Sequence, residues 1–359
     1  MKNFLLTLLL SVAVCMASYA QDLHFSQYTS APMLLNPALT ASWKDFALTI
    51  QQKQQWQSVN AFSTSGLAFE IKASRFNWEK NDKRPSSYKK KLMKGLAFGI
   101  NVYSDKAGDA SMRTNNVNLG IAYHARLNEL NALSAGIIGG IIQSSVAIDK
   151  LRWNNQYGAA GYDPTIFSNE NMVGSRIYPD FGTGVVWTYG KVARTISSDN
   201  ETNAHVGISV MHVNRPNQSF LGGEDRMHMR YTFHGAGEFG LTNSNLSLCP
   251  SFAFMRQGKQ KEMTLGMVFK FAMKESSRVT GFIKESSVLF GCYYRSKDAV
   301  APYFGFEFSN YSLGFSYDVN ISGLKAATKS VGGIEVTFRL ANLAKAYLYQ
   351  NKNKTKTPD

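Results

Sequence analysis

The stretch YSLGFSYDVN, residues 311–320, decides the fold class. Large apolar residues alternate in it with small or polar ones: Tyr311, Leu313, Phe315, Tyr317 and Val319 against Ser312, Gly314, Ser316 and Asp318. A period of two is typical of a β-strand whose two faces meet different surroundings. In a soluble sandwich the apolar face packs inward, whereas in a membrane-spanning barrel it faces lipid and the polar residues line the lumen. One strand leaves both architectures open.

The same alternation recurs along the chain, for example in NVNLGIAYHARL (116–127), DFGTGVVWTYG (180–190) and GIEVTFRL (333–340). Such runs predict strands at 44–55, 62–72, 94–104, 112–126, 131–144, 180–191, 203–213, 228–239, 245–256, 261–272, 287–296, 300–309, 311–319 and 331–340. The total is about fourteen, an even number that suits a closed antiparallel barrel with both termini on one side. We therefore predict an all-β transmembrane barrel over residues 44–340.

The N-terminus predicts export. MKNFLLTLLLSVAVCMASYA (1–20) combines the basic Lys2, an apolar run, and the small residues Ser18 and Ala20. These features are typical of a secretory signal peptide, here cleaved after Ala20. No later apolar run reaches the ~18 residues that a membrane helix needs. A membrane-embedded chain would therefore have to be a barrel.

A soluble all-β protein is the alternative fold. Its best support is the mean hydropathy of −0.22, which a polar lumen and polar loops would also explain. The signal peptide and the 17 Tyr, 23 Phe and 5 Trp residues favour the membrane barrel. We accordingly expect a multi-pass protein of the outer membrane that contacts lipid.

The segment 21–43 is unlike a strand. Pro32 and Pro37 each lack the backbone N–H that a strand ladder needs. We expect the segment to plug the lumen or to lie across its periplasmic mouth, and the alternative is a plain leader into the first strand. Its candidate functional residues are Phe25, Gln27, Tyr28, Asn36 and Pro37.

The long loops suggest where a partner binds. Barrels of this class have short periplasmic turns and longer outer loops. If the first strand runs outward, the segments 145–179, 214–227 and 320–330 lie outside. The first is rich in aromatic residues, which protein interfaces favour. We expect it to bind a secreted partner, and the alternative is that it folds inward and constricts the lumen. The candidate partner-binding residues are Trp153, Tyr157, Tyr162, Phe167, Asn217 and Phe220.

The formal net charge is +14. Nucleic acid is not the expected partner, because the chain is exported and carries no nucleic-acid fold signature. Basic residues gather in 76–94, which includes Lys89, Lys90 and Lys91, and in the tail 341–359. Both stretches fall on the predicted periplasmic side. There they would meet anionic headgroups or an acidic partner, or remain solvated without a partner.

No motif predicts an enzyme, a metal site or a cofactor. The six histidines form no HExxH motif and no Cys/His pairing at metal spacing. A nucleophile elbow and a phosphate-binding loop are also missing from the sequence. Cys249 and Cys292 lie in strand-like runs, and we expect them to be unpaired; the alternative is a disulfide between them in an oxidising compartment.

Beyond the alternation, QDLHFSQYTSAPMLLNPALTASW (21–43) resembles the opening of the PorP/SprF family of outer-membrane proteins from the type IX secretion system of Bacteroidetes. Further similar stretches follow in order: QQWQSVNAFSTSGLAFE, GLAFGINVYSDKAGD, LRWNNQYG, PDFGTGVVW, VGISVMHVNRPNQSF and LGFSYDVNIS. The resemblance covers residues 21–340. It is specific, because unrelated barrels share the alternation but not this ordered set.

The resemblance implies an accessory barrel that works beside a secretion pore in secretion, surface attachment or gliding. The implied partners are a secreted surface protein or adhesin and other type IX secretion components on the periplasmic side. The alternative function is a channel or transporter for small or hydrophobic solutes, because barrels of this size can hold or conduct ligands. A plugged lumen and long shaped outer loops favour the accessory barrel, whereas an open polar lumen favours the channel.

Overall fold

The structure is a computed structural model. It describes residues 25–42, 46–56, 62–73, 95–108, 111–128, 130–158, 161–168, 170, 172–191, 202–242, 244–274, 286–322 and 331–342. Three predictions lie outside these residues: the signal peptide 1–20, the role of Lys89, Lys90 and Lys91, and nearly all of the basic tail.

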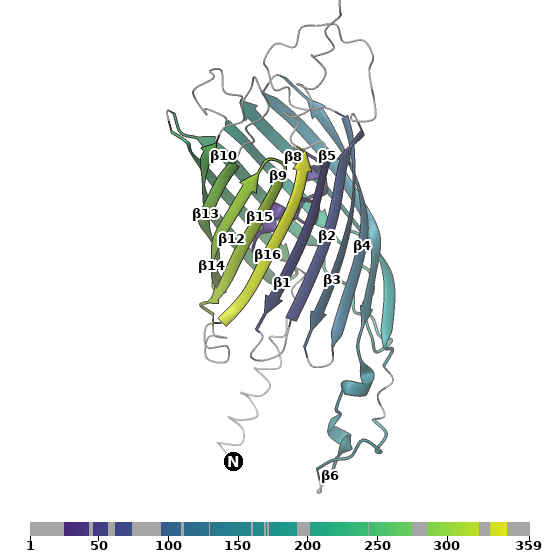
Figure 1. Cartoon of the computed structure of the whole chain (residues 1–359). Coiled ribbons are helices and arrows are strands. Elements are labelled where there is room, and N and C mark those ends of the chain that lie inside the picture. The colour runs from purple at the N-terminus through teal and green to yellow at the C-terminus, as the bar shows by residue number, and fades with distance from the viewer. Residues whose placement is uncertain are drawn as a thin grey trace, which may run out of the picture.

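Fourteen strands of the described chain close into one antiparallel barrel (Figure 1). They are β1 (Phe46–Gln55), β2 (Phe62–Lys72), β3 (Gly95–Ala107), β4 (Met112–Arg126), β5 (Asn131–Ser145), β8 (Ser175–Lys191), β9 (Thr202–Met211), β10 (Arg230–Gly240), β11 (Leu246–Gln257), β12 (Gln260–Lys274), β13 (Ser286–Arg295), β14 (Ala299–Phe308), β15 (Tyr311–Asn320) and β16 (Val331–Asn342). Each pairs with the next strand of the barrel, and β16 closes on β1 with Phe338 opposite Ile50. The predicted closed barrel is confirmed.

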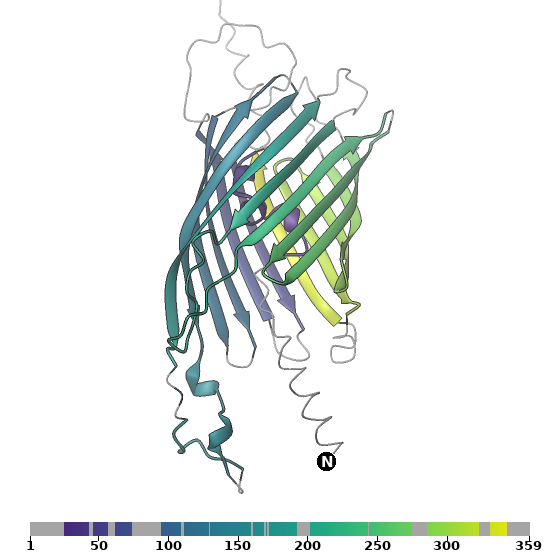
Figure 2. The same ribbon diagram turned by 180° about the vertical axis from the view of Figure 1, so that it is seen from behind.

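The barrel has two distinct ends. β1 begins and β16 ends at one of them, which we call the terminal end. The turns 127–130, 241–245 and 309–310 also join strands there. At the opposite end, residues 146–174 connect β5 to β8 and project beyond the wall (Figures 1 and 2). We call this segment the extension and this end the extension end.

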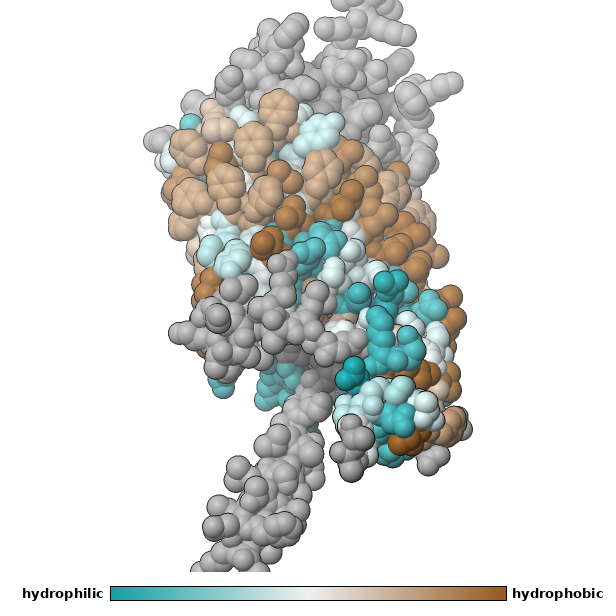
Figure 3. All heavy atoms as spheres, turned by 60° about the horizontal axis from the view of Figure 1, so that its bottom comes forward, coloured by the Kyte–Doolittle hydropathy of each residue, from teal (hydrophilic) through white to brown (hydrophobic). Residues whose placement is uncertain are grey.

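The alternation in the sequence follows the two faces of the wall. In β15, Phe315 and Tyr317 point outward and are 43% and 41% exposed, whereas Ser316 and Asp318 point into the lumen and are 4% and 1% exposed. Figure 3 shows the resulting apolar surface in brown on the part of the barrel wall that faces the viewer. The apolar faces therefore lie outside a closed barrel, and the sandwich alternative is wrong.

The segment predicted as a loop over 145–179 is shorter and more ordered than expected. β8 begins at Ser175, so Tyr178 lies in the wall and is buried. The extension contains the 3-10 helices η4 (Ile148–Lys150) and η5 (Asn154–Gln156) and a hairpin of β6 (Tyr157–Gly158) and β7 (Gly161–Tyr162). Elements of two or three residues carry too little periodicity to be recognised in the sequence.

Cys249 and Cys292 are free, as expected. Cys249 lies opposite Val268, and Cys292 lies opposite Met267. Successive strand residues point to opposite faces, and Val268 is buried while Met267 is exposed. The two thiols therefore lie on opposite sides of the wall, Cys249 facing the lumen and Cys292 facing outward.

Residues 25–42 lie inside the barrel, and we call them the plug. The plug contains η1 (Tyr28–Ser30), α2 (Pro32–Leu35) and η2 (Pro37–Leu39), drawn in purple within the wall in Figures 1 and 2. Pro32 and Pro37 occupy the first positions of their helical turns, where the missing N–H has no helical partner to lose. The prolines that exclude a strand thus fit the short helices. All five residues singled out in this segment are buried: Phe25, Gln27, Tyr28, Asn36 and Pro37.

Candidate functional site

Four buried charged side chains stand in the wall where the plug begins. Lys53, Arg295, Asp318 and Glu335, which we call the ionic cluster, are each at most 6% exposed. They lie near the extension end of their strands. Arg295 Nη2 is 3.0 Å from Asp318 Oδ2, and Lys53 Nζ is 3.5 Å from the same oxygen. The cluster therefore sets two cations against two carboxylates.

The start of the plug completes this cluster. The Ser26 hydroxyl donates to Asp318, 2.7 Å from Oδ1. The backbone N–H groups of Ser26 and Gln27 donate to the two Glu335 oxygens at 2.7 and 3.0 Å. The Gln27 amide donates to Ser316 Oγ at 3.1 Å. A buried charge is tolerated only with good partners, so the ionic cluster and the first plug residues stabilise one another.

Asn36 holds the middle of the plug. Its amide nitrogen donates to the backbone oxygens of Ile208 and Val185 at 3.0 and 3.2 Å and lies 3.0 Å from Nε2 of His234. Its amide oxygen accepts the Ala38 N–H at 2.9 Å. Asn36 thus ties the plug to β8, β9 and β10 at once.

The wall carries glycine where the plug touches it. A Cβ on Gly184 would lie 2.0 Å from Oδ1 of Asn36, and a Cβ on Gly136 would lie 2.5 Å from the Ala38 nitrogen. Side chains do not fit at such distances, so only glycine allows this close approach. Glycines that alternate with large apolar residues in β5 and β8 therefore form part of the contact surface for the plug.

The plug ends near the terminal end of the barrel. Glu70 Oε2 accepts the Ala41 N–H at 2.6 Å, and His124 Nε2 lies 2.9 Å from the Thr40 oxygen. Glu70 and His124 stand near the last residues of β2 and β4, which lead to the terminal end. The plug therefore crosses the lumen, from the extension end at Ser26 to the terminal end at Thr40.

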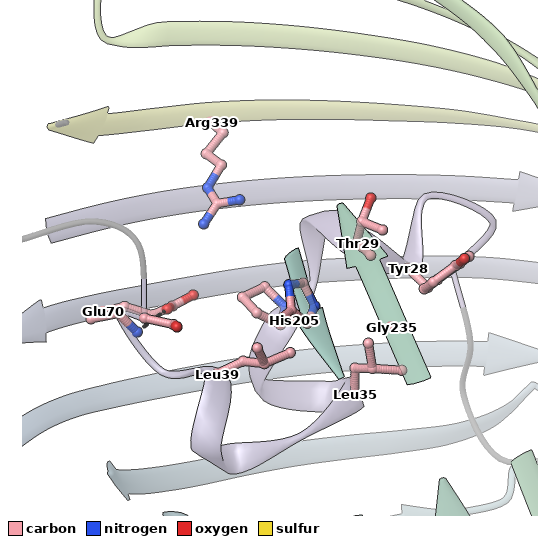
Figure 4. Close-up of a pocket in the computed structure, with 12 residues that line it drawn as sticks. Tyr28, Thr29, Leu35, Leu39, Glu70, His205, Gly235 and Arg339 are labelled. Carbon is pink, nitrogen blue, oxygen red and sulfur yellow. Dashed lines mark hydrogen bonds between the residues drawn. The ribbon is translucent and has the colours of Figure 1, made fainter. Parts of the chain in front are cut away.

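A small cavity remains beside the plug, with a volume of about 90 Å³ (Figure 4). It is lined by Tyr28, Leu35, Leu39, Glu70, His205 and Arg339, among others. This volume suits a few waters and falls below the ~300 Å³ of ordinary ligand pockets.

The extension is ordered by local contacts. Its hairpin packs the Tyr157 and Tyr162 rings together, with centroids 5.4 Å apart. The hydroxyl and backbone N–H of Thr165 donate to Asp163 Oδ1 at 2.6 and 2.9 Å and lower the pKa of that exposed carboxyl. The extension therefore has a defined shape that points away from the lumen (Figure 2).

The loop 212–229 is fixed beside the extension. The Val173 N–H donates to the Phe220 oxygen at 2.9 Å and joins the two segments. Asn217 Oδ1 accepts the N–H groups of Ser219 and Asp225 at 3.1 and 3.0 Å and shapes the loop. The structure thus brings residues from both predicted partner-binding segments to one end of the barrel.

Some of these residues carry large exposed apolar surface. Phe167 is 80% exposed, Leu221 is 64% exposed and Tyr157 is 51% exposed. We call these three the exposed apolar group. Trp153, Tyr162 and Phe220 are half-buried, and Asn217 is exposed and polar. Leu221 could not be singled out from the sequence, because it lies in an irregular loop that has no periodicity.

Sequence reasoning also missed the ionic cluster. Asp318 stood out only as a polar residue on the small face of its strand. The available signal was a charge at a lumen-facing position of an alternating strand, as with Lys53 and Glu335. Charges there need partners across the lumen.

Within the described part of the chain, no group of three or more His, Cys, Asp or Glu residues could hold a metal ion. No helix in that part is long and apolar enough to cross a membrane.

Three solved barrels are similar in part. A NanC porin is 8% identical, with 82% of this chain and 98% of that chain covered and a TM-score of 0.37. BamA from Haemophilus ducreyi, lacking POTRA domains 1–3, is 10% identical, with 83% and 70% covered and a TM-score of 0.38. A Pseudomonas aeruginosa FadL homologue is 12% identical, with 85% and 91% covered and a TM-score of 0.37.

No curated protein matches the chain. The model of one family, described as type IX secretion system membrane protein PorP/SprF, matches residues 17–340. That match covers the plug and every strand of the barrel except the last two residues of β16. The chain therefore belongs to the PorP/SprF family of type IX secretion system membrane proteins.

Proposed function

We propose that this protein is an outer-membrane accessory barrel of the type IX secretion system that holds a secreted surface protein at its extension end. The signal peptide is cleaved after Ala20, and the exported chain inserts as a barrel. Other secretion components meet it from the periplasm. The secreted surface protein, an adhesin, docks on the extension and on the loop 212–229, and serves surface attachment or gliding.

The proposed orientation follows from the two barrel ends. Outer-membrane barrels join their strands by short turns on the periplasmic side and carry their longer loops on the outside. Two long connections of the described chain, the extension and the loop 212–229, lie at the extension end, beside the short turns 258–259 and 296–298. The extension end therefore faces outward.

The exposed apolar group carries the proposal. Phe167, Leu221 and Tyr157 lie on an ordered platform rather than in a core. Aromatic side chains are enriched in the buried centres of interfaces and supply much of their binding energy. Figure 3 shows apolar side chains on the extension, set among hydrophilic ones.

The plug argues against a conduction role. It crosses the lumen between the ionic cluster and the terminal end, and it contacts the wall without space for side chains at Gly136 and Gly184. The cavity of about 90 Å³ beside it is small. The geometry therefore supports an anchor better than a channel.

The test replaces both Phe167 and Leu221 with Ser. These two are better probes than Trp153, which is half-buried and donates its backbone N–H to Oε1 of Gln156 at 3.0 Å. The control is Glu224→Ala in the loop 212–229, since Glu224 forms an exposed ion pair with Arg226 there, and such pairs contribute about 0–1 kcal/mol.

We expect the double variant to lose surface display of the secreted partner, while barrel abundance, heat-modifiable gel migration and conductance in planar bilayers stay unchanged. The control should display the partner normally. Intact display in the double variant would refute the proposed role of the exposed apolar group. Intact display together with raised conductance would favour the channel.

A further inference from the structure

An apolar groove is cut into the outward face of the wall across β9 to β13. Its volume is about 600 Å³, within the ~300–1,000 Å³ of ligand pockets. The small residues Ala204 and Gly237 of the groove lie on the halves of β9 and β10 nearer the terminal end, whereas its rim reaches Tyr294, next to the last residue of β13 at the extension end.

The groove exists because three neighbouring outward positions, Ala204, Gly235 and Gly237, lack large side chains. Gly235 pairs with Val206, and Gly237 pairs with Ala204. The surrounding outward positions carry large apolar side chains that form the rim: Phe239, Phe252, Met267 and Tyr294. Elsewhere on the wall, large apolar residues fill such positions, as Phe233 does on the same strand.

The strand ladder is also interrupted at this place. The β10–β11 ladder runs in one register but lacks the pairs between Gly237 and Pro250 and between Glu238 and Cys249. Pro250 has no N–H to donate, which removes a ladder bond. Gly235 and Ala236 also line the cavity beside the plug. The groove and the cavity beside the plug are therefore separated at Gly235 and Ala236 by the backbone and one methyl group.

We propose that this groove binds one acyl chain of a phospholipid. The inference rests on the proposed membrane placement. The groove opens on the face where Val206, Leu265 and Met267 are exposed, so hydrocarbon is the medium that reaches it. An unfilled apolar recess forfeits dispersion contacts along its lining, and a hydrocarbon chain restores them without any polar partner.

The lining of the groove determines which part of a lipid it recognises. The groove runs across five strands, from Ala204 near the terminal end of β9 to Tyr294 near the extension end of β13. Its lining is almost wholly apolar and offers no cationic side chain for a headgroup. The occupant is therefore recognised through its hydrocarbon, and its headgroup stays at the membrane surface.

The experiment reconstitutes the full barrel into vesicles that contain phosphatidylethanolamine with a diazirine on one acyl chain. After illumination, mass spectrometry maps the labelled residues. Ala204→Leu and Val206→Phe each fill the groove with a larger side chain. Ile208→Leu is the matched control, because Ile208 lies on the same strand, points outward and is 60% exposed outside the groove.

We expect label on the rim residues Phe239, Phe252 and Met267, in excess of the label at the lipid-facing Ile141 of β5. Both filled variants should lose this excess, whereas the Ile208→Leu control should keep it. Equal label at the rim and at Ile141 would overturn the proposal that the groove binds an acyl chain. An excess of label that survives in both filled variants would overturn it as well. Absence of label everywhere on the wall, Ile141 included, would instead overturn the membrane placement itself.

Discussion

Ser26 of the plug donates its hydroxyl to the Asp318 carboxylate of β15 at 2.7 Å, across 292 positions of sequence. Arg295 donates to the same carboxylate from Nη2 at 3.0 Å. One buried side chain thus joins the plug to the cationic side of the ionic cluster. Its charge holds Ser26, among the first described residues of the plug, at this point of the wall.

Asp318→Asn should destabilise the barrel and loosen the plug. Removing one partner of a buried ion pair leaves an uncompensated charge, at a cost of about 3–5 kcal/mol. The measurement is the temperature of the heat-modifiable gel shift, with conductance as a second readout. Asp225→Asn in the exposed loop 212–229 is the control. An unchanged gel-shift temperature for Asp318→Asn would show that the ionic cluster does not hold the plug.

Gly184→Ala should displace the plug and leave the strands paired. The new Cβ would lie 2.0 Å from Oδ1 of Asn36, the residue whose amide nitrogen contacts three strands. Conductance in planar bilayers should rise, while membrane insertion stays normal. Gly158→Ala is the matched control, because a Cβ on Gly158 meets nothing within 4 Å. Equal conductance of the two variants would contradict a tightly fitted plug.

Phe338→Arg should impair insertion, because Phe338 points outward from the closing strand while its neighbour Thr337 is buried in the lumen. A charge on the lipid face costs up to ~2–4 kcal/mol at the bilayer midplane. The measurement is barrel assembled in the outer membrane, with Phe338→Leu as the control. Assembly of the Arg variant at the level of the Leu variant would mean that this face does not meet lipid.

The plug runs from the extension end to the terminal end, so its first residues should be accessible from outside the cell. Ser26 lies at the ionic cluster near the extension end, and Thr40 lies near the terminal end. A short epitope placed directly before Phe25 should therefore bind antibody on intact cells. The same epitope after Asn128, in a turn at the terminal end, should bind only after permeabilisation. The reverse pattern would invert the proposed orientation.

The barrel could be predicted from the sequence because each strand shows the alternation of apolar and polar residues within its own sequence. Alternation depends only on the two faces of a strand, so β2 and β4 were predicted with the bounds that the structure has. The start of β8 was placed too late, because Pro179 and the mixed stretch before it weaken the pattern. The small hairpin of the extension is too short to leave a pattern.

The contacts of the plug could not be predicted in the same way. Pro32 and Pro37 exclude a strand, but they do not reveal which wall residue each plug residue meets. Asn36 touches β8, β9 and β10, and Ser26 meets β15 and β16. Such contacts form only when the barrel has closed around the plug, and the sequence around each residue does not indicate them.

The central claim is that the extension holds a secreted protein at the cell surface. Its most direct test places a photo-crosslinking amino acid at Phe167 in living cells, with the same amino acid at the outward Phe315 of the wall as the control. The account predicts that illumination joins the barrel to a secreted surface protein from position 167 and not from position 315. Absence of that adduct at 167, in a barrel that is inserted and plugged, would contradict it.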